Sequence, residues 1–71
     1  MQPLVSVVIP THNRARYAIH AIQSVLGQGD DRLELVVSDT SNDDELARWV
    51  AEHPAGRDSR LNYVRPEQRL D

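Results

Sequence analysis

The sequence predicts an α/β fold in which three parallel strands alternate with two helices. Residues 4–9 are almost continuously hydrophobic, which suits a parallel strand covered on both faces, and residues 33–39 are predicted to form a second buried strand. A segment with the apolar spacing of a helix follows each run, and a weaker third strand is predicted at 61–65. The order β-α-β-α-β favours one parallel sheet with right-handed crossovers.

The first strand is expected to end at Pro10, and the apolar pattern of the first helix starts at Tyr17, with Arg14 and Arg16 near the start of that helix. The predicted packing stripe of this helix follows the i, i+1, i+4, i+5 pattern and comprises Tyr17, Ala18, Ala21, Ile22, Val25 and Leu26. We expect the helix to end at Gly27, where a left-handed cap is easily adopted.

The second strand closes on the carboxylate of Asp39. Ser41 or Asn42 can cap the second helix, whose first turn would carry three acidic residues favoured by the helix dipole, Asp43, Asp44 and Glu45. Its packing face is predicted to consist of Leu46, Trp49 and Val50. Residues 53–59 combine proline, glycine and polar residues and are predicted to form a loop.

Composition limits the chain to one small domain or part of a larger one. Its 71 residues include no cysteine and only 39% hydrophobic residues. The net charge of −3, with eight basic residues that are all arginine, disfavours nucleic acid as a partner. No segment is long enough to span a bilayer, and Met1, Gln2 and Pro3 do not resemble a signal peptide. A cytoplasmic protein is the default expectation, and any membrane association would come from parts outside these residues.

Strand order decides whether the unit is self-contained. We expect the order 3-2-1, because consecutive strands usually lie side by side. Right-handed crossovers then place both helices on one face and leave the opposite face of the sheet bare. On this basis we expect residues 1–71 to be one truncated segment. An order of 2-1-3 would instead place one helix on each face.

Ligands of open parallel sheets bind beyond the carboxyl ends of the strands. Two segments are expected to meet there, residues 10–14 after the first strand and residues 38–41 after the second. The first is not a G-x-G-x-x-G turn, and the chain contains no G-x-x-x-x-G-K-[ST]. Neither an ordinary dinucleotide site nor a P-loop is therefore predicted.

The opening of family-2 glycosyltransferases resembles three segments of this chain, VSVVIPTHNR at 5–14, AIQSVLGQ at 21–28 and LELVVSD at 33–39. The chain departs from the common pattern at Ser38, where many members are acidic, and at Thr40, where many carry Gly, Asn or Asp. The resemblance implies that the βαβαβ unit is the Rossmann-like half at the N-terminus of a GT-A fold. Residues 1–71 would then be the N-terminal nucleotide-sugar-binding segment of a glycosyltransferase domain.

The same resemblance implies roles for individual residues. Pro10, Thr11 and His12 would border the base of the nucleotide, and the imidazole offers a flat face for stacking. Asp39 would accept an N–H of the base in a charge-assisted hydrogen bond. Independently of the resemblance, Arg14 could meet a phosphate because it lies at the start of the first helix.

Each of these residues also has a structural interpretation. Thr11 and Asn13 could bond the loop backbone or cap the first helix, and Asp39 could be a turn residue at the end of its strand. Arg14 could simply be solvated. The acidic pairs at 30–31 and 43–44 are explained by turn formation and by the helix dipole, so we assign no metal ligand to them.

The reaction implied by the resemblance is transfer of a sugar from a nucleotide diphosphate to an acceptor hydroxyl, with inversion. A UDP-sugar is the favoured donor, and the acceptor would be a sugar, polysaccharide or lipid. The chemistry needs a divalent cation, Mg²⁺ or Mn²⁺, bound in the family through an Asp-x-Asp motif that this chain lacks. No catalytic residue is assigned here. The alternatives are a catalytically inactive nucleotide-binding module and a small α/β interaction domain.

Overall fold

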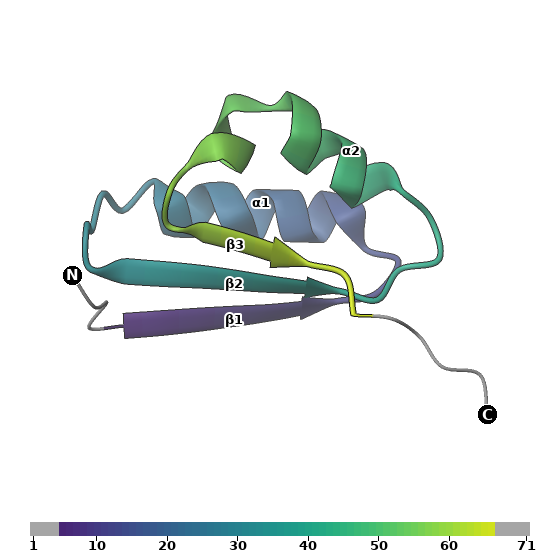
Figure 1. Ribbon diagram of the computed structural model, residues 1–71, viewed down its shortest axis with the longest axis horizontal. Helices are drawn as coiled ribbons and strands as arrows, with labels where there is room; N and C mark the ends of the chain where they lie inside the picture. The colour runs from purple at the N-terminus through teal and green to yellow at the C-terminus, as the bar shows by residue number, and fades with distance from the viewer. Residues whose placement is uncertain (1–4, 67–71) are drawn as a thin grey trace.

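The computed structural model describes residues 5–66 and has the predicted β-α-β-α-β order (Figure 1). A short 3₁₀ helix precedes the last strand. The elements are β1 (Val5–Thr11), α1 (Ala15–Leu26), β2 (Leu33–Asp39), α2 (Glu45–Glu52), η1 (Pro54–Arg57) and β3 (Leu61–Val64). Leu4, predicted to open the first strand, lies outside the described residues.

The three strands form one parallel sheet with β2 in the middle. The order β1-β2-β3 is the predicted order 3-2-1 seen from the other edge, so that prediction is confirmed. Val7 lies opposite Leu35, and Leu35 lies opposite Leu61, so the short strand β3 begins opposite Leu35. Because the strands are parallel, the segments that follow them emerge at the same edge.

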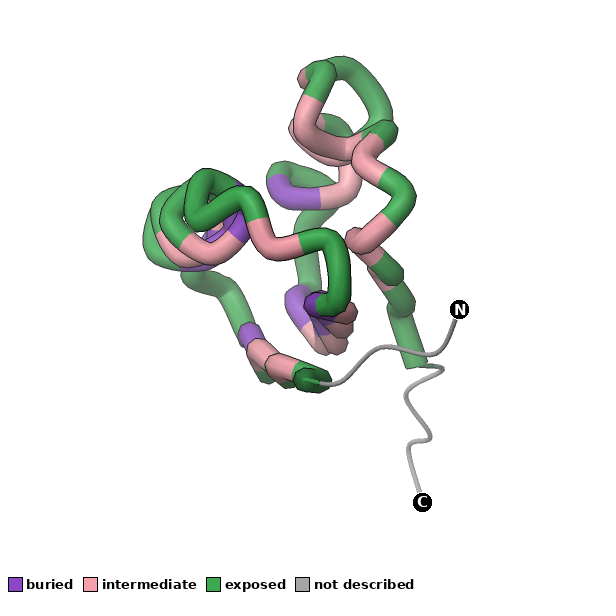
Figure 2. The backbone as a smooth tube through the Cα atoms, turned by 90° about the vertical axis from the view of Figure 1, so that its left-hand side faces the viewer, coloured by how far each residue is buried: buried purple, intermediate pink, exposed green. Residues whose placement is uncertain are grey.

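Both helices lie on one face of this sheet, as the right-handed crossovers predict (Figures 1 and 2). The core lies between the two layers. Alternate residues of β2 point into it, and Leu35 and Val37 are completely buried there against Ile22 of α1. Leu46 of α2 is also buried in this core. Among the described residues, no helix is long and apolar enough to cross a membrane.

The other face of the sheet carries no helix among residues 5–66 (Figure 2). Val8 is 62% exposed there, and its register partner Val36 is half-buried. Polar side chains interrupt these valines, among them Ser6, which donates a hydrogen bond to Glu34. The bare face predicted from the strand order is therefore present, although it is more mixed in polarity than expected.

Pro10 does not end the first strand, contrary to the prediction. β1 continues through Pro10 to Thr11, and Pro10 lies opposite Ser38 in the parallel register. Among the described strands, β1 pairs only with β2. A proline lacks the N–H that a second neighbour would need, and it is therefore tolerated in a strand paired on one side.

Both predicted helix ends differ in detail. Gly27 follows α1 but has right-handed backbone angles (φ −68°, ψ −11°), and the positive φ lies at Gly29. Neither Ser41 nor Asn42 caps α2, which begins later, at Glu45. Ser41 is buried and binds the loop after β1 instead. Because the side chain of Ser41 makes this tertiary hydrogen bond, it does not cap the helix.

Arg60 ties together the amino ends of β2 and β3. Its guanidinium group donates to the backbone oxygens of Leu26 (3.0 Å) and Asp30 (3.1 Å), and it forms an ion pair of 2.7 Å with Asp58. Hydrogen bonds from the side chain and backbone of Arg60 lower the pKa of Asp58 from 3.8 to about 2. These contacts lie at the opposite end of the sheet from the expected ligand site.

We expect Asp58→Asn to destabilise the chain at neutral pH but not near pH 2. A carboxyl group whose folded pKa is lowered adds stability above its unfolded pKa and loses it as the pH falls through the folded value. The difference in melting temperature between Asp58→Asn and the unaltered chain should therefore shrink as the pH falls from 3.8 towards about 2. Melting curves followed by circular dichroism at several pH values test this, and a constant difference would contradict it.

Candidate functional site

The two loops at the carboxyl ends of β1 and β2 are joined by hydrogen bonds. The backbone N–H of Thr40 donates to Thr11 O (3.0 Å), and the N–H of Asn13 donates to Ser41 Oγ (2.7 Å). The N–H of Asn42 donates in turn to the side-chain oxygen of Asn13 (2.9 Å). Residues 10–14 and 38–41 thus form one surface, called the rim below, and the predicted meeting of these segments is confirmed.

Asn13 holds a backbone conformation that few residues adopt. Its φ is 56°, in the left-handed region that asparagine tolerates better than most residues. Arg14, not Asn13, occupies the N-cap position of α1, and no side chain caps this helix. The structure therefore supports bonding to the loop backbone, one of the two structural roles considered for Asn13, and not helix capping.

His12 is exposed at the rim, and its ring is held on both nitrogens. Nδ1 lies 2.9 Å from Thr40 O, and a carbonyl oxygen only accepts, so Nδ1 carries the proton. Nε2 lies 3.2 Å from the amide nitrogen of Asn13 and accepts from it. The orientation of that amide is fixed because its oxygen accepts from Asn42. One neutral tautomer of His12 satisfies all these contacts.

Asp39 lies at the end of β2 as predicted, but it is almost completely buried, with 1% of its surface exposed. One carboxylate oxygen accepts from the N–H of Ser41 (2.9 Å), and the other from the hydroxyl of Tyr63 (2.5 Å). Thr11, its partner in the register, is also buried. The predicted contact between Asp39 and a base stays a prediction.

The environment of Asp39 favours its charged form. Burial alone would raise the pKa of Asp39, but the hydrogen bonds from Ser41 and Tyr63 and the charge of Arg65 outweigh it and lower the pKa. Burial and the hydrogen bond to Asp39 raise the pKa of Tyr63. The pair is therefore a carboxylate and a phenol, with the phenol donating.

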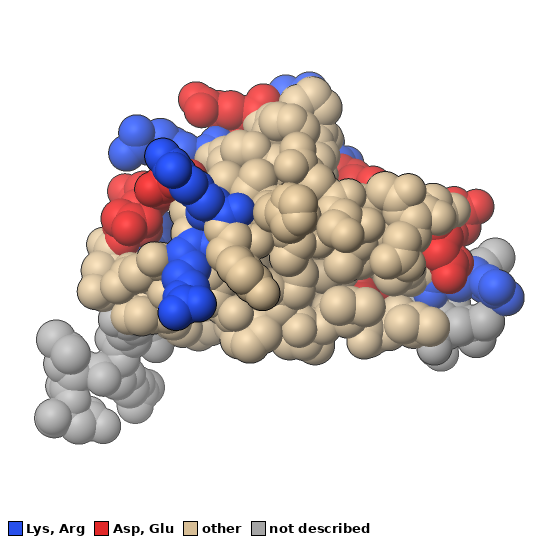
Figure 3. All heavy atoms as spheres, turned by 180° about the vertical axis from the view of Figure 1, so that it is seen from behind, with Lys and Arg blue, Asp and Glu red and all other residues tan. Residues whose placement is uncertain are grey.

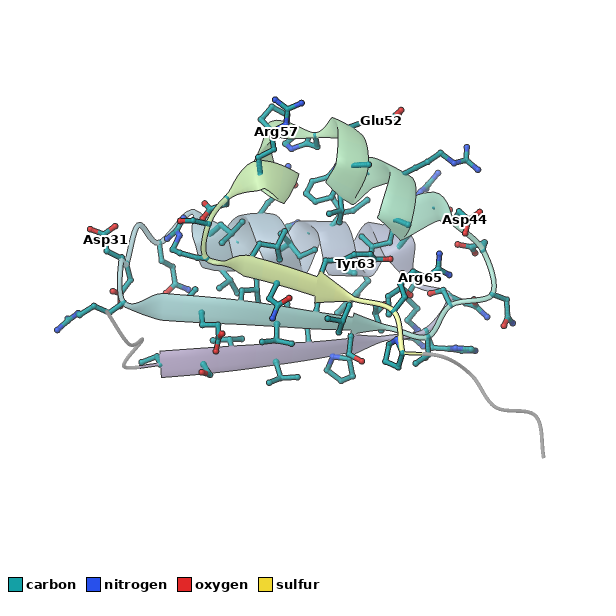
Figure 4. All side chains as sticks on the ribbon, in the orientation of Figure 1. Asp31, Asp44, Glu52, Arg57, Tyr63 and Arg65 are labelled. Carbon is teal, nitrogen blue, oxygen red and sulfur yellow. The ribbon has the colours of Figure 1, made fainter. Side chains whose placement is uncertain are left out.

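Arg65 fastens the segment that follows β2. Its guanidinium donates to Ser41 O (2.9 Å), Asp43 O (2.8 Å) and the carboxylate of Asp44 (2.8 Å). Figure 4 shows Tyr63 and Arg65 beside this segment, with Asp31 at the far end of the sheet. From the sequence, no role was predicted for Tyr63, and the side chain of Ser41 was considered only as a helix cap. In the parallel register Tyr63 lies opposite Val37, which is two residues before Asp39 on the same face of the sheet. This register could have indicated the contact between Tyr63 and Asp39.

Two shallow depressions at the rim share Pro10, Thr11 and His12 in their lining. One, of about 200 Å³, is lined by Pro10, Thr11, His12, Ser38 and Thr40. The other, of about 300 Å³, is lined by Ile9, Pro10, Thr11, His12, Arg14, Tyr17 and Ala18. Four of the five predicted site residues line these depressions, and Asp39 is buried beside them. Figure 3 shows both positive and negative side chains at this end of the molecule, on its left, and an uncharged surface in the middle.

A larger hollow, of about 550 Å³, lies between the two helices. Its lining includes Ile19 and Trp49 but is mainly charged, with Asp43, Asp44, Glu45, Arg48 and Glu52. Four carboxylates would repel a phosphorylated ligand. Within residues 5–66, no group of three or more histidine or carboxylate side chains could hold a metal ion.

Comparison with known proteins agrees with the resemblance. The model of the family described as glycosyl transferase family 2 matches residues 6–71. A chondroitin synthase of Escherichia coli is 36% identical over 62 residues, which cover 87% of this chain and 9% of that protein. Uncharacterized glycosyltransferases of Rickettsia conorii and Rickettsia felis are each 36% identical over 59 residues, or 83% of this chain.

The chain spans about a tenth of the length of these three relatives (9%, 9% and 10%). The α/β architecture with its parallel sheet is consistent with the GT-A fold that the resemblance implies. Together with the match over residues 6–71, this shows that the chain belongs to glycosyl transferase family 2.

Proposed function

We propose that this chain forms the nucleotide-binding part of a glycosyltransferase, with the donor's base and ribose at the rim. The observation that carries the proposal is the place of the two depressions, at the carboxyl ends of parallel strands in a chain of this family. The flat, exposed ring of His12 supports a stacked base there. Backbone peptide groups and hydroxyl groups of the two loops surround the proposed position of the base.

Each predicted site residue has a place in this proposal. Pro10, Thr11 and His12 border the base, and Arg14, exposed at the start of α1, faces the phosphates. Asp39 contributes from below the surface, and acceptance of an N–H from the base is the role that the resemblance implies for it. Such a contact would require the base to reach a carboxylate that is 1% exposed.

The reaction that we propose is inverting transfer of a sugar from a nucleotide diphosphate, preferably a UDP-sugar, to a hydroxyl of a sugar, polysaccharide or lipid. A divalent cation, Mg²⁺ or Mn²⁺, would neutralise charge on the leaving diphosphate. The described residues do not form a ligand set for it, so we derive no step through the metal. A cytoplasmic site of action also stays a proposal.

Calorimetric titration of UDP into the full-length protein tests this proposal. We expect binding that UDP-sugars compete for and that inorganic phosphate at the same concentration does not reproduce, because the base supplies much of the contact. Absence of binding with and without Mg²⁺ or Mn²⁺ would contradict the nucleotide site. The alternative of a small interaction domain would then be favoured.

Residues 1–71 by themselves are expected to transfer no sugar. They contain no Asp-x-Asp, and no general base has been assigned within them. Release of UDP from UDP-sugars by the purified 71-residue chain, with Mg²⁺ or Mn²⁺ present, measures this directly. Turnover above the rate of a heat-denatured sample would show that the chemistry resides in this segment after all.

A further inference from the structure

We infer that Asp39 is a positioning residue for the nucleotide site: anchored by Tyr63, it holds Ser41, and through Ser41 it fixes the turn that carries His12. This inference rests on the proposed function, since it concerns how the same rim is kept in shape. It assigns Tyr63 and Ser41 to the site, and it gives Asp39 a role that needs no contact with the ligand.

The first step is the anchoring of the carboxylate. Asp39 is buried, and Tyr63 from the neighbouring strand donates its hydroxyl to one carboxylate oxygen at 2.5 Å. Such a charge-assisted O–H···O⁻ bond is short and about twice as strong as a neutral one. The carboxylate is therefore bound to Tyr63 of β3, which is 24 residues away along the chain.

The second step leads from the carboxylate to the loop after β1. The backbone N–H of Ser41 donates to one carboxylate oxygen of Asp39 at 2.9 Å, which fixes the position of Ser41. The hydroxyl oxygen of Ser41 accepts the N–H of Asn13 at 2.7 Å. Ser41 thus connects the two loops.

The third step leads from Asn13 to the exposed ring. The left-handed backbone of Asn13 is fixed by its N–H bond to Ser41 and by the bond that its side-chain oxygen accepts from Asn42. In this position its amide group donates to Nε2 of His12. Loss of the Asp39 carboxylate would loosen Ser41 and Asn13, and with them the ring on which the base is proposed to stack.

The variant Ser41→Ala separates this role from a direct contact. It removes the hydroxyl oxygen that accepts from Asn13 but leaves in place the carboxylate of Asp39 and the backbone N–H of Ser41 that binds it. It is compared with Asp39→Asn, with the double variant, and with Ser24→Ala as a control on the exposed side of α1. Tyr63→Phe, which keeps the ring and removes only the donor, serves if Asp39→Asn does not fold.

Two readouts are made on the full-length protein. Calorimetric titration gives the dissociation constant of UDP, and ¹⁵N NMR of selectively labelled histidine reports the tautomer and environment of the His12 ring without any ligand. We expect Ser41→Ala and Asp39→Asn each to weaken UDP binding about 3- to 10-fold, as for the loss of one hydrogen bond. The double variant should bind UDP no more weakly than either single variant. Ser41→Ala and Asp39→Asn should each shift the His12 signals. Ser24→Ala should change neither readout.

Weaker UDP binding in Asp39→Asn with unchanged binding in Ser41→Ala would overturn the inference and favour direct contact with the base. Normal binding and unchanged His12 signals in both variants would also overturn it, while leaving the proposed function intact. If the unaltered protein does not bind UDP, the proposed function fails. The histidine signals still decide whether Asp39 holds the His12 turn, because they are read from the free protein.

Discussion

Leu35→Ala is expected to lower the free energy of unfolding by about 2–5 kcal/mol, the range for truncation of a large apolar side chain in a core. Leu35 is completely buried at the centre of β2, between Val7 and Leu61 of the two neighbouring strands. Truncation removes apolar contact and leaves a cavity under α1. A small domain has only about 5–15 kcal/mol of stability in total, so the loss should be large.

Denaturant unfolding of the chain, followed by the fluorescence of Trp49, measures this effect. Val36→Ala is the matched control, since Val36 is the next residue of the same strand and lies half-buried on the face without helices. We expect it to cost less than about 1 kcal/mol, because little contact is lost at a half-buried site. Equal losses at both positions would contradict a core on one face only.

His12→Ala is expected to weaken UDP binding about 5- to 150-fold, corresponding to the 1–3 kcal/mol that stacking of a base on an aromatic ring contributes. The imidazole is exposed, lines both depressions of the rim and is held in place on both nitrogens. It can therefore stack on a base without first losing rotational freedom.

Two further variants show whether the ring itself is responsible. His12→Phe keeps a flat face but loses both hydrogen bonds, so we expect it to bind UDP more tightly than His12→Ala. His20→Ala removes an exposed histidine on α1, outside the two rim depressions, and should leave binding unchanged. An equal loss in His12→Ala and His20→Ala, measured by calorimetry, would speak against a base at the rim.

Hydrophobic patterns were enough to predict the order of the elements and the sheet. The runs at 4–9 and 33–39 and the helical stripe are local signals, and right-handed crossovers then place both helices. The prediction was wrong for Tyr17, which was expected in the packing stripe but is 72% exposed. Pro10 misled the prediction because proline usually breaks a strand. Its tolerance here depends on pairing with only one neighbouring strand, which no local pattern reveals.

The contacts inside the candidate site are mostly long-range in sequence. Ser41 has the residue type and position of a helix cap, yet its hydroxyl accepts from Asn13, 28 residues away. Asp39 looked like an accessible carboxylate until the sheet register brought Tyr63 to it. The meeting of residues 10–14 and 38–41 followed from the parallel order of the strands. Which side chains of the rim are exposed could be seen only once the strands were aligned.

Hydrogen exchange with and without UDP tests the central claim most directly, because it locates the ligand on the chain. Mass spectrometry of the full-length protein should show slower exchange in peptides that cover residues 10–14 and 38–44 when UDP is saturating. Peptides around Arg32 and Arg60, at the amino ends of the strands, should exchange as before. Protection confined to other regions, with the two rim segments unchanged, would contradict a nucleotide site at the carboxyl ends of β1 and β2.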